Sequence, residues 1–180
     1  MQKIKVTCIF ENMTFNRSFF AGLGQSLLLE VDDKKYLFDT AENYDGLTYN
    51  MKRLGIELTD IQTVILSHNH LDHSGSLFRL YKQFTQQQLF LPPDMRTLDE
   101  KNYDVQYRTE PKDTAIQHLL EYKKTTIVRE GIQIAENMYT TGALEAPDKE
   151  QSLVVNIPGK GLVLLMPIQH SLLLLKQRER

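Results

Sequence analysis

The sequence Ser-His-Asn-His-Leu-Asp-His at residues 67–73 constrains this chain more strongly than any other feature. It holds three of the chain's five histidines and directly follows a short apolar segment, Thr63–Leu66, whose β-branched residues are typical of a strand. His68 and His70 are two residues apart at the end of that strand. In extended backbone their side chains leave the same side and can converge on one ion. The pattern therefore predicts a metal site at a strand end.

Asp72 and His73 fall in the turn into the next helix, where the backbone rotates and can direct both side chains back toward the same pocket. Neutral imidazole nitrogen and carboxylate oxygen are the ligands that zinc, iron and manganese share. The alternative is a structural role, in which Asp72 or Ser74 merely caps the helix. A cap needs only one short polar residue and leaves three imidazoles unexplained, so we favour the metal site.

The elements around the motif alternate in type along the chain. The apolar patterns predict strands at residues 3–10, 26–31, 35–38, 63–66, 88–91, 125–134, 138–140, 152–157 and 161–166. Helices are predicted from Asp45 as the cap to Gly55, from about Ser74 to Phe84, and more weakly at Asp113–Lys123. This order indicates an α+β fold whose sheets are covered by helices. With 180 residues and no linker or repeat, we expect a single domain spanning residues 1–180.

The composition disfavours several classes of function. The 21 basic and 23 acidic residues leave no bulk field that would attract nucleic acid. No apolar stretch approaches the roughly 20 residues needed to span a bilayer, and the first residues lack the apolar core of a signal peptide. Cys8 is the single cysteine of the sequence, so no intramolecular disulfide can form. We therefore expect a cytoplasmic protein that binds a small-molecule substrate and neither nucleic acid nor a membrane.

His-x-His-x-Asp-His after an apolar strand resembles the signature of the metallo-β-lactamase superfamily. Residues 24–30, 35–41 and 63–68 are similar to the successive opening elements of that fold. Residues 140–142, 151–155 and 160–165 resemble, more narrowly, the branch of dihydropterin ribofuranosyl-aminobenzene phosphate synthase-like metallohydrolases. The match covers about residues 1–165 and implies a four-layer αββα sandwich with the metals at one edge.

The resemblance also implies roles for the matching residues. His68 and His70 would hold a first metal ion, while Asp72 and His73 would hold a second, with Asp72 also the catalytic residue. Asp39 would accept a hydrogen bond that fixes a ligand imidazole, although a plain strand-end turn is an equal alternative. The cofactor would be one or two zinc ions, with iron or manganese as alternatives. In the superfamily's hydrolases, a water bridging the metals attacks a carbonyl or phosphoryl centre.

The match breaks after residue 165. There the branch carries a Thr-Gly-Cys-Ser/Ala-His segment, whereas this chain reads Met-Pro-Ile-Gln-His at residues 166–170. His170 keeps the register and could complete the first metal site, or it could be a lone histidine in a divergent tail, residues 166–180. A later histidine of the family, in a Gly-Gly-Phe-His-like segment, has no counterpart before Arg180. We therefore expect a truncated or frameshifted C-terminus and a sandwich that lacks its last elements. An exposed sheet edge could then join chains into a homo-oligomer.

These observations support two hypotheses. The first is a zinc-dependent hydrolase in which metal-activated water attacks a small, anionic or phosphorylated substrate. The second is a degenerate or truncated member with partial metal binding and no catalysis, because a site with only two protein ligands holds its metal weakly. A nucleic-acid-processing member is disfavoured, since the sequence shows no basic cleft.

Overall fold

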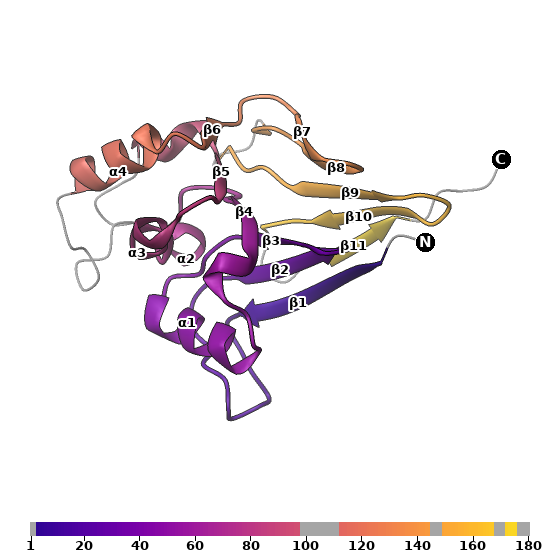
Figure 1. The fold of residues 1–180 in the computed structure, drawn as a ribbon, viewed down its shortest axis with the longest axis horizontal. Coiled ribbons are helices and arrows are strands. Elements are labelled where there is room, and N and C mark those ends of the chain that lie inside the picture. Colours follow the sequence, from indigo (N-terminus) through magenta and orange to yellow (C-terminus); the bar gives the residue numbers. More distant parts are fainter. Residues whose placement is uncertain (1–2, 98–111, 145–148, 168–171, 176–180) are drawn as a thin grey trace.

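The computed structural model describes residues 3–97, 112–144, 149–167 and 172–175. Two β-sheets pack against each other, and helices cover the outer face of the first sheet (Figure 1). None of the helices in these residues is long and apolar enough to cross a membrane.

The first sheet has the strand order β1-β2-β3-β4-β5-β6. Its strands are β1 (Ile4–Phe10), β2 (Ser26–Val31), β3 (Lys34–Phe38), β4 (Ile61–Ile65), β5 (Gln88–Leu91) and β6 (Thr125–Ile127). The strands β1, β2 and β3 are antiparallel, whereas β3 to β6 run parallel. Asp32 forms the turn between β2 and β3 with a left-handed backbone, φ 54°, which aspartate tolerates better than most residues.

Helical segments join the parallel strands. They are α1 (Tyr44–Arg53), η1 (Leu58–Asp60), α2 (Leu71–Ser74), α3 (Leu77–Leu80), η2 (Tyr81–Gln83), η3 (Pro93–Thr97) and α4 (Lys112–Glu121). The cap of α1 is Asn43, whose Oδ1 accepts a hydrogen bond from the Gly46 N–H at 2.8 Å. The predicted cap, Asp45, instead lies in the first turn, where its charge favours the helix N-terminus.

The second sheet is antiparallel throughout and has the strand order β11-β10-β9-β8-β7. Its strands are β7 (Gln133–Ala135), β8 (Met138–Thr140), β9 (Leu153–Ile157), β10 (Gly161–Leu165) and β11 (Leu172–Leu175). Within the described residues, neither hydrophobic core joins this sheet to a helix.

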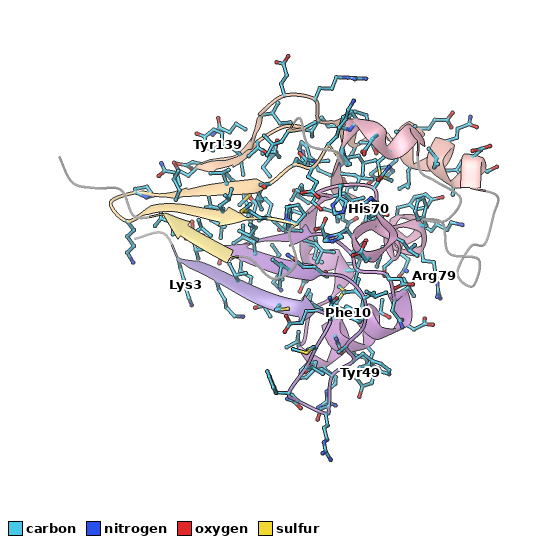
Figure 2. The ribbon with its side chains drawn as sticks, turned by 180° about the vertical axis from the view of Figure 1, so that it is seen from behind. Lys3, Phe10, Tyr49, His70, Arg79 and Tyr139 are labelled. Atoms are coloured by element: carbon cyan, nitrogen blue, oxygen red, sulfur yellow. The ribbon has the colours of Figure 1, made fainter. Side chains whose placement is uncertain are left out.

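Two hydrophobic cores follow from the alternation of side chains along the strands. Leu28, Leu37 and Val64 face the helices, whereas their neighbours Leu29 and Phe38 face the second sheet. In the part of the chain that the structure describes, the layers are therefore helix, sheet and sheet, which confirms the α+β sandwich class expected from the sequence. Figure 2 shows the molecule from behind, with His70 where the helices meet the strand ends and Tyr139 on the second sheet.

Two predicted elements are divided in the structure. The helix expected from about Ser74 to Phe84 is split into α2, α3 and η2, because the Ser74 hydroxyl bonds back to the carbonyls of Asn69 and His70 and a turn follows at residues 75–76. The strand expected over residues 125–134 was wrong as a single element. Its two ends, β6 and β7, belong to different sheets, so the chain passes from one sheet to the other there.

Candidate metal centre

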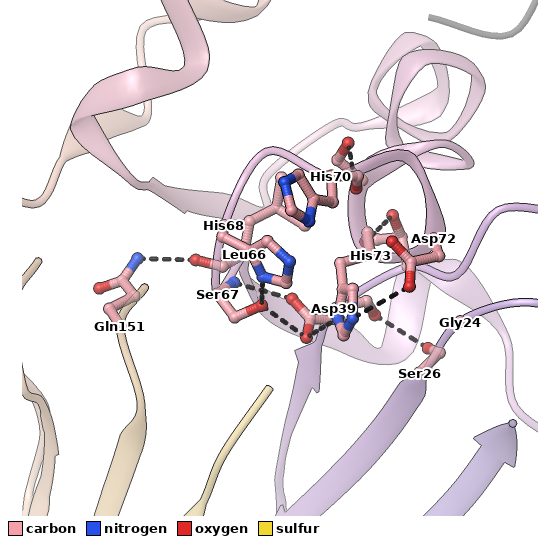
Figure 3. A network of polar contacts seen from close by, with 12 residues as sticks. Gly24, Ser26, Asp39, Leu66, Ser67, His68, His70, Asp72, His73 and Gln151 are labelled. Carbon is pink, nitrogen blue, oxygen red and sulfur yellow. Dashed lines mark hydrogen bonds and ion pairs between the residues drawn. The ribbon is translucent and has the colours of Figure 1, made fainter. Parts of the chain in front are cut away.

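The site lies where two neighbouring parallel strands end. Asp39 follows β3, and Ser67 and His68 follow β4, so both segments leave the sheet at the same edge. The Asp39 backbone is left-handed, φ 60°, and its N–H donates to the Ile65 carbonyl at 2.9 Å. The carboxylate of Asp39 consequently lies beside the histidine motif (Figure 3).

Three donors hold this carboxylate, which is fully buried. Oδ1 accepts a hydrogen bond from the Ser67 backbone N–H at 2.7 Å. Oδ2 accepts one from the Ser67 hydroxyl at 2.8 Å and one from Nδ1 of His73 at 2.8 Å. A buried carboxylate is tolerated only when its oxygens are paired in this way. Asp39 therefore contacts an imidazole of the motif directly.

The same network fixes the tautomers of two histidines. The Ser67 hydroxyl has a single hydrogen, which it donates to Asp39. Its 2.9 Å contact with Nδ1 of His68 must therefore be a hydrogen bond donated by the ring. His73 also donates from Nδ1. In their neutral forms, both rings thus leave Nε2 free as a lone-pair ligand atom.

Donor atoms of His68, Asp72 and His73 lie within 4.8 Å of one another. The rings of His68 and His73 have centroids 4.3 Å apart. Nε2 of His73 lies 3.5 Å from a carboxylate oxygen of Asp72. Two imidazoles with free Nε2 atoms and one carboxylate, gathered this closely, match the nitrogen and oxygen ligands of zinc and related ions. The residues present therefore fit a metal ion.

His70 is the residue immediately before α2, and the centroid of its ring lies 4.6 Å from that of His68. It does not belong to the tight group formed by His68, Asp72 and His73. The four motif side chains thus meet at one edge of the sheet, with His70 at the margin of the group. His170, the remaining predicted ligand, lies outside the described residues.

The two buried histidines have opposite pKa shifts. Burial, reinforced by the nearby His73, lowers the pKa of His68 to about 4, so this ring is neutral near pH 7. Burial also opposes the charged form of His73, but the charge of Asp39 and the hydrogen bond to it, together with the charges of Asp72 and Glu150, outweigh burial and raise the pKa of that ring. Near pH 7 a metal ion would not compete with a proton for His68, whose pKa is low. At His73, whose pKa is raised, it would have to displace a more firmly held proton.

The backbone of the motif is clamped from both sheets. The Thr40 N–H and hydroxyl both donate to the His73 carbonyl, at 2.7 and 2.9 Å. From the loop before β9, Gln151 donates from its backbone to the Ser67 carbonyl and from its side chain to the Leu66 carbonyl. Sequence reasoning missed Ser67, Thr40 and Gln151. Ser67 could have been found as the hydroxyl residue preceding the first histidine. Gln151 begins a segment that resembles the family branch, but its partner Leu66 is 85 residues away and no local pattern indicates that contact.

Comparison with known proteins agrees with this site. The family model described as the metallo-beta-lactamase superfamily matches residues 20–113, just over half of the chain. Among curated proteins, the 7,8-dihydropterin-6-methyl-4-(beta-D-ribofuranosyl)-aminobenzene-5'-phosphate synthase of Methanocaldococcus jannaschii is 30% identical over 164 residues. That alignment covers 83% of this chain and 53% of the synthase, so the chain spans about half the length of this relative. The match supports the branch to which the sequence was assigned.

Solved structures show the same fold at lower identity. A quorum-quenching N-acyl homoserine lactone lactonase is 21% identical with a TM-score of 0.55, covering 78% of this chain and 58% of that chain. A metallo-beta-lactamase-type protein of Thermotoga maritima is 16% identical with a TM-score of 0.54, covering 91% of this chain and 76% of that chain. With the histidine and aspartate cluster at the strand ends and the family model spanning the motif, the chain belongs to the metallo-beta-lactamase superfamily.

Proposed function

We propose that this chain is a metal-dependent hydrolase that uses zinc to act on a small, anionic or phosphorylated substrate. The observation that carries the proposal is the group of donor atoms from His68, Asp72 and His73 within 4.8 Å of one another. The hydrogen bonds of the two imidazoles support it, because both rings are held at Nδ1 and each neutral ring then offers Nε2 to an ion.

Each residue of the site has a distinct task in this proposal. His68 and His73 would hold the ion through Nε2 and Asp72 through a carboxylate oxygen, with His70 adding a further imidazole. A bound zinc ion would act as a Lewis acid and lower the pKa of water enough for attack on a carbonyl or phosphoryl centre near neutral pH. The side chain of Asp72 is 38% exposed, whereas that of Asp39 is 0% exposed. Of these two carboxylates, Asp72 is the one that solvent or a substrate can reach.

A bound ion would favour an anionic substrate. A divalent ion held by two neutral imidazoles and one carboxylate keeps a charge of about +1 among its ligands, and the buried Asp39 carboxylate behind His73 brings the whole cluster close to neutral. The attraction for a phosphate or carboxylate group therefore comes from direct contact with the ion. The name of the M. jannaschii relative also includes a 5'-phosphate, which supports a phosphorylated ligand. That relative is named as a synthase, whereas the lactonase opens a lactone, so the reaction itself has to be measured.

The second candidate is a member that binds metal without catalysis. Its support comes from the sequence at residues 166–170, where Met-Pro-Ile-Gln-His replaces the Thr-Gly-Cys-Ser/Ala-His segment of the branch and keeps only the histidine. The two candidates differ in turnover rather than in metal binding, so binding alone does not separate them.

The test is a substrate screen on metal-loaded protein. Phosphoesters, thioesters, lactones and lactams would be offered to the full chain loaded with zinc, manganese or iron, with His68→Ala as the control. Hydrolysis of one class that His68→Ala and a chelator both abolish is the expected result. Metal binding without turnover of any class would support the non-catalytic candidate and reject the hydrolase.

A further inference from the structure

A segment remote from the histidine motif lies against the backbone of the metal-site turn. The backbone N–H of Gln25, just before β2, donates to the Asp72 carbonyl at 3.2 Å. The preceding residue, Gly24, is itself held, because its N–H donates to Oδ1 of Asn12 at 2.8 Å. Figure 3 shows Gly24 close to Asp72. The hydrogen bond to Asn12 thus links the segment after β1 to Gly24, and Gln25, the next residue, bonds to the metal-site turn.

The approach of Gly24 to Asp72 excludes any side chain. A Cβ at Gly24 would lie 1.8 Å from the Asp72 carbonyl oxygen and 2.6 Å from its carbonyl carbon. The obstacle is backbone and cannot rotate aside, so one of the two segments would have to move. The backbone of Gly24 is also left-handed, φ 108°.

Gly159 shows that a glycine can have a left-handed backbone without lying against another segment. Gly159, in the turn between β9 and β10, has φ 73°, and a Cβ there would meet nothing within 4 Å. A substitution at Gly159 therefore carries the backbone strain without the collision. This pair of glycines separates the effect of strain from the effect of contact.

We infer that Asn12 and Gly24 form a positioning strap that fixes the place of the Asp72 carboxylate relative to the histidines. The neighbouring ligands have their own supports: Asp39 and Ser67 hold His68, and Thr40 holds the His73 carbonyl. The Asp72 backbone is held from a third segment, because the Gln25 N–H donates to its carbonyl and the strap holds the neighbouring Gly24. The inference rests on the proposed function, and it adds that residues far from the motif determine how well Asp72 serves as a ligand.

The strap predicts a different change in zinc affinity for each of four substitutions. Gly24→Ala should displace the α2 turn at Asp72 and weaken zinc binding more than tenfold. Asn12→Ala removes only the acceptor for the Gly24 N–H and should weaken binding several-fold. Asn12→Asp keeps an acceptor oxygen and should restore the affinity toward that of the native chain. Gly159→Ala, the matched control, should bind zinc like the native chain.

The experiment is zinc titration of the purified, metal-free full chain, together with the visible absorption spectrum of its cobalt form. We expect the cobalt spectrum of Gly24→Ala to change, because a ligand atom has moved, while that of Gly159→Ala does not. A Gly24→Ala chain with native zinc affinity and the native cobalt spectrum would overturn the inference. Equal weakening in Gly24→Ala and Gly159→Ala would overturn it too, since that result reports only loss of stability.

Amide exchange in the metal-free chain tests the strap separately from the proposed function. The Gln25 N–H should be protected in the native, Asn12→Asp and Gly159→Ala chains and should exchange faster in Gly24→Ala and Asn12→Ala. If the native chain bound no zinc, the proposed function would fail. The exchange rate of the Gln25 N–H would then still test whether the strap holds the Asp72 backbone. Unchanged exchange in both strap variants would reject the strap even if the native chain binds zinc.

Discussion

Replacing Asp39 by asparagine changes one atom at the centre of the network, and its effect can be worked out from the structure. Two donors, the Ser67 hydroxyl and Nδ1 of His73, converge on Oδ2, while the Ser67 backbone N–H points at Oδ1. An amide offers one oxygen and one NH₂ group. The backbone N–H cannot turn away, so the amide oxygen should stay at Oδ1 and the NH₂ group should replace Oδ2.

That orientation reverses the tautomers. The NH₂ group donates to Ser67 and His73, so His73 must accept at Nδ1 and carry its hydrogen on Nε2. The Ser67 hydroxyl is then released to donate to Nδ1 of His68, which likewise moves the His68 hydrogen to Nε2. Both ligand atoms become blocked. Loss of one such supporting partner typically weakens metal binding 10–100-fold. Because Asp39→Asn affects two ligands, we expect at least about a 100-fold loss, or about 2.7 kcal/mol.

The assay is a zinc titration in competition with a chromophoric chelator at constant pH, together with nitrogen NMR of the imidazoles in the metal-free chain. Asp60→Asn is the matched control, because Asp60 is an aspartate paired with Lys35 away from the site. Native-like zinc affinity in Asp39→Asn, within about threefold, would refute the reasoning. Hydrogens that remain on both Nδ1 atoms in this variant would refute it as well.

Three further predictions follow from the same structure. Ser67→Ala leaves Asp39 with two of its three donors but removes the partner of His68 Nδ1, so zinc titration should show a loss of about 10–100-fold, smaller than for Asp39→Asn. Asn50→Ala removes three hydrogen bonds to the backbone of Ile9 and Phe20, so urea unfolding should show a loss of about 2–4 kcal/mol, whereas a loss below about 1 kcal/mol would contradict this. The third concerns pH in the metal-free chain. The pKa of His68 is lowered from 6.5 to about 4, so the unfolded chain binds the proton first, and His68 should reduce the unfolding free energy by about 3 kcal/mol as the pH falls through that range. The raised pKa of His73 has the opposite effect, because its contribution is complete below pH 6.5 and is lost as the pH rises through the folded-state pKa. His68→Gln should remove the acid loss and His73→Gln the alkaline loss, and unchanged pH profiles would contradict both assignments.

The features that could be predicted from the sequence are those whose signals are local. The spacing of His68, His70, Asp72 and His73 is readable because strand and turn geometry acts over a few residues. The opening strands of the first sheet were predicted within about a residue, because their apolar alternation and turn residues are local as well. Asp39 was selected through the resemblance, and the residues alone left its role open.

The remaining features depend on contacts between distant segments. The Gln151 side chain donates to the carbonyl of Leu66, 85 residues away, and no neighbouring residue in the sequence indicates this contact. Gly24 looks like an ordinary turn glycine until its distance to the Asp72 carbonyl is known. The division of the helix after Ser74 depends on a side chain bonding back to the backbone, a choice that apolar periodicity does not reveal.

The most direct test of the metal centre is the zinc content of the purified full chain, measured by elemental analysis after loading and removal of free metal. We expect at least one tightly held zinc ion per chain, lost in His68→Ala and in His73→Ala and retained in His118→Ala, a histidine of α4 outside the motif. A native chain that retains no zinc, or a His68→Ala chain that retains as much as the native one, would contradict the assignment of this cluster as a metal centre.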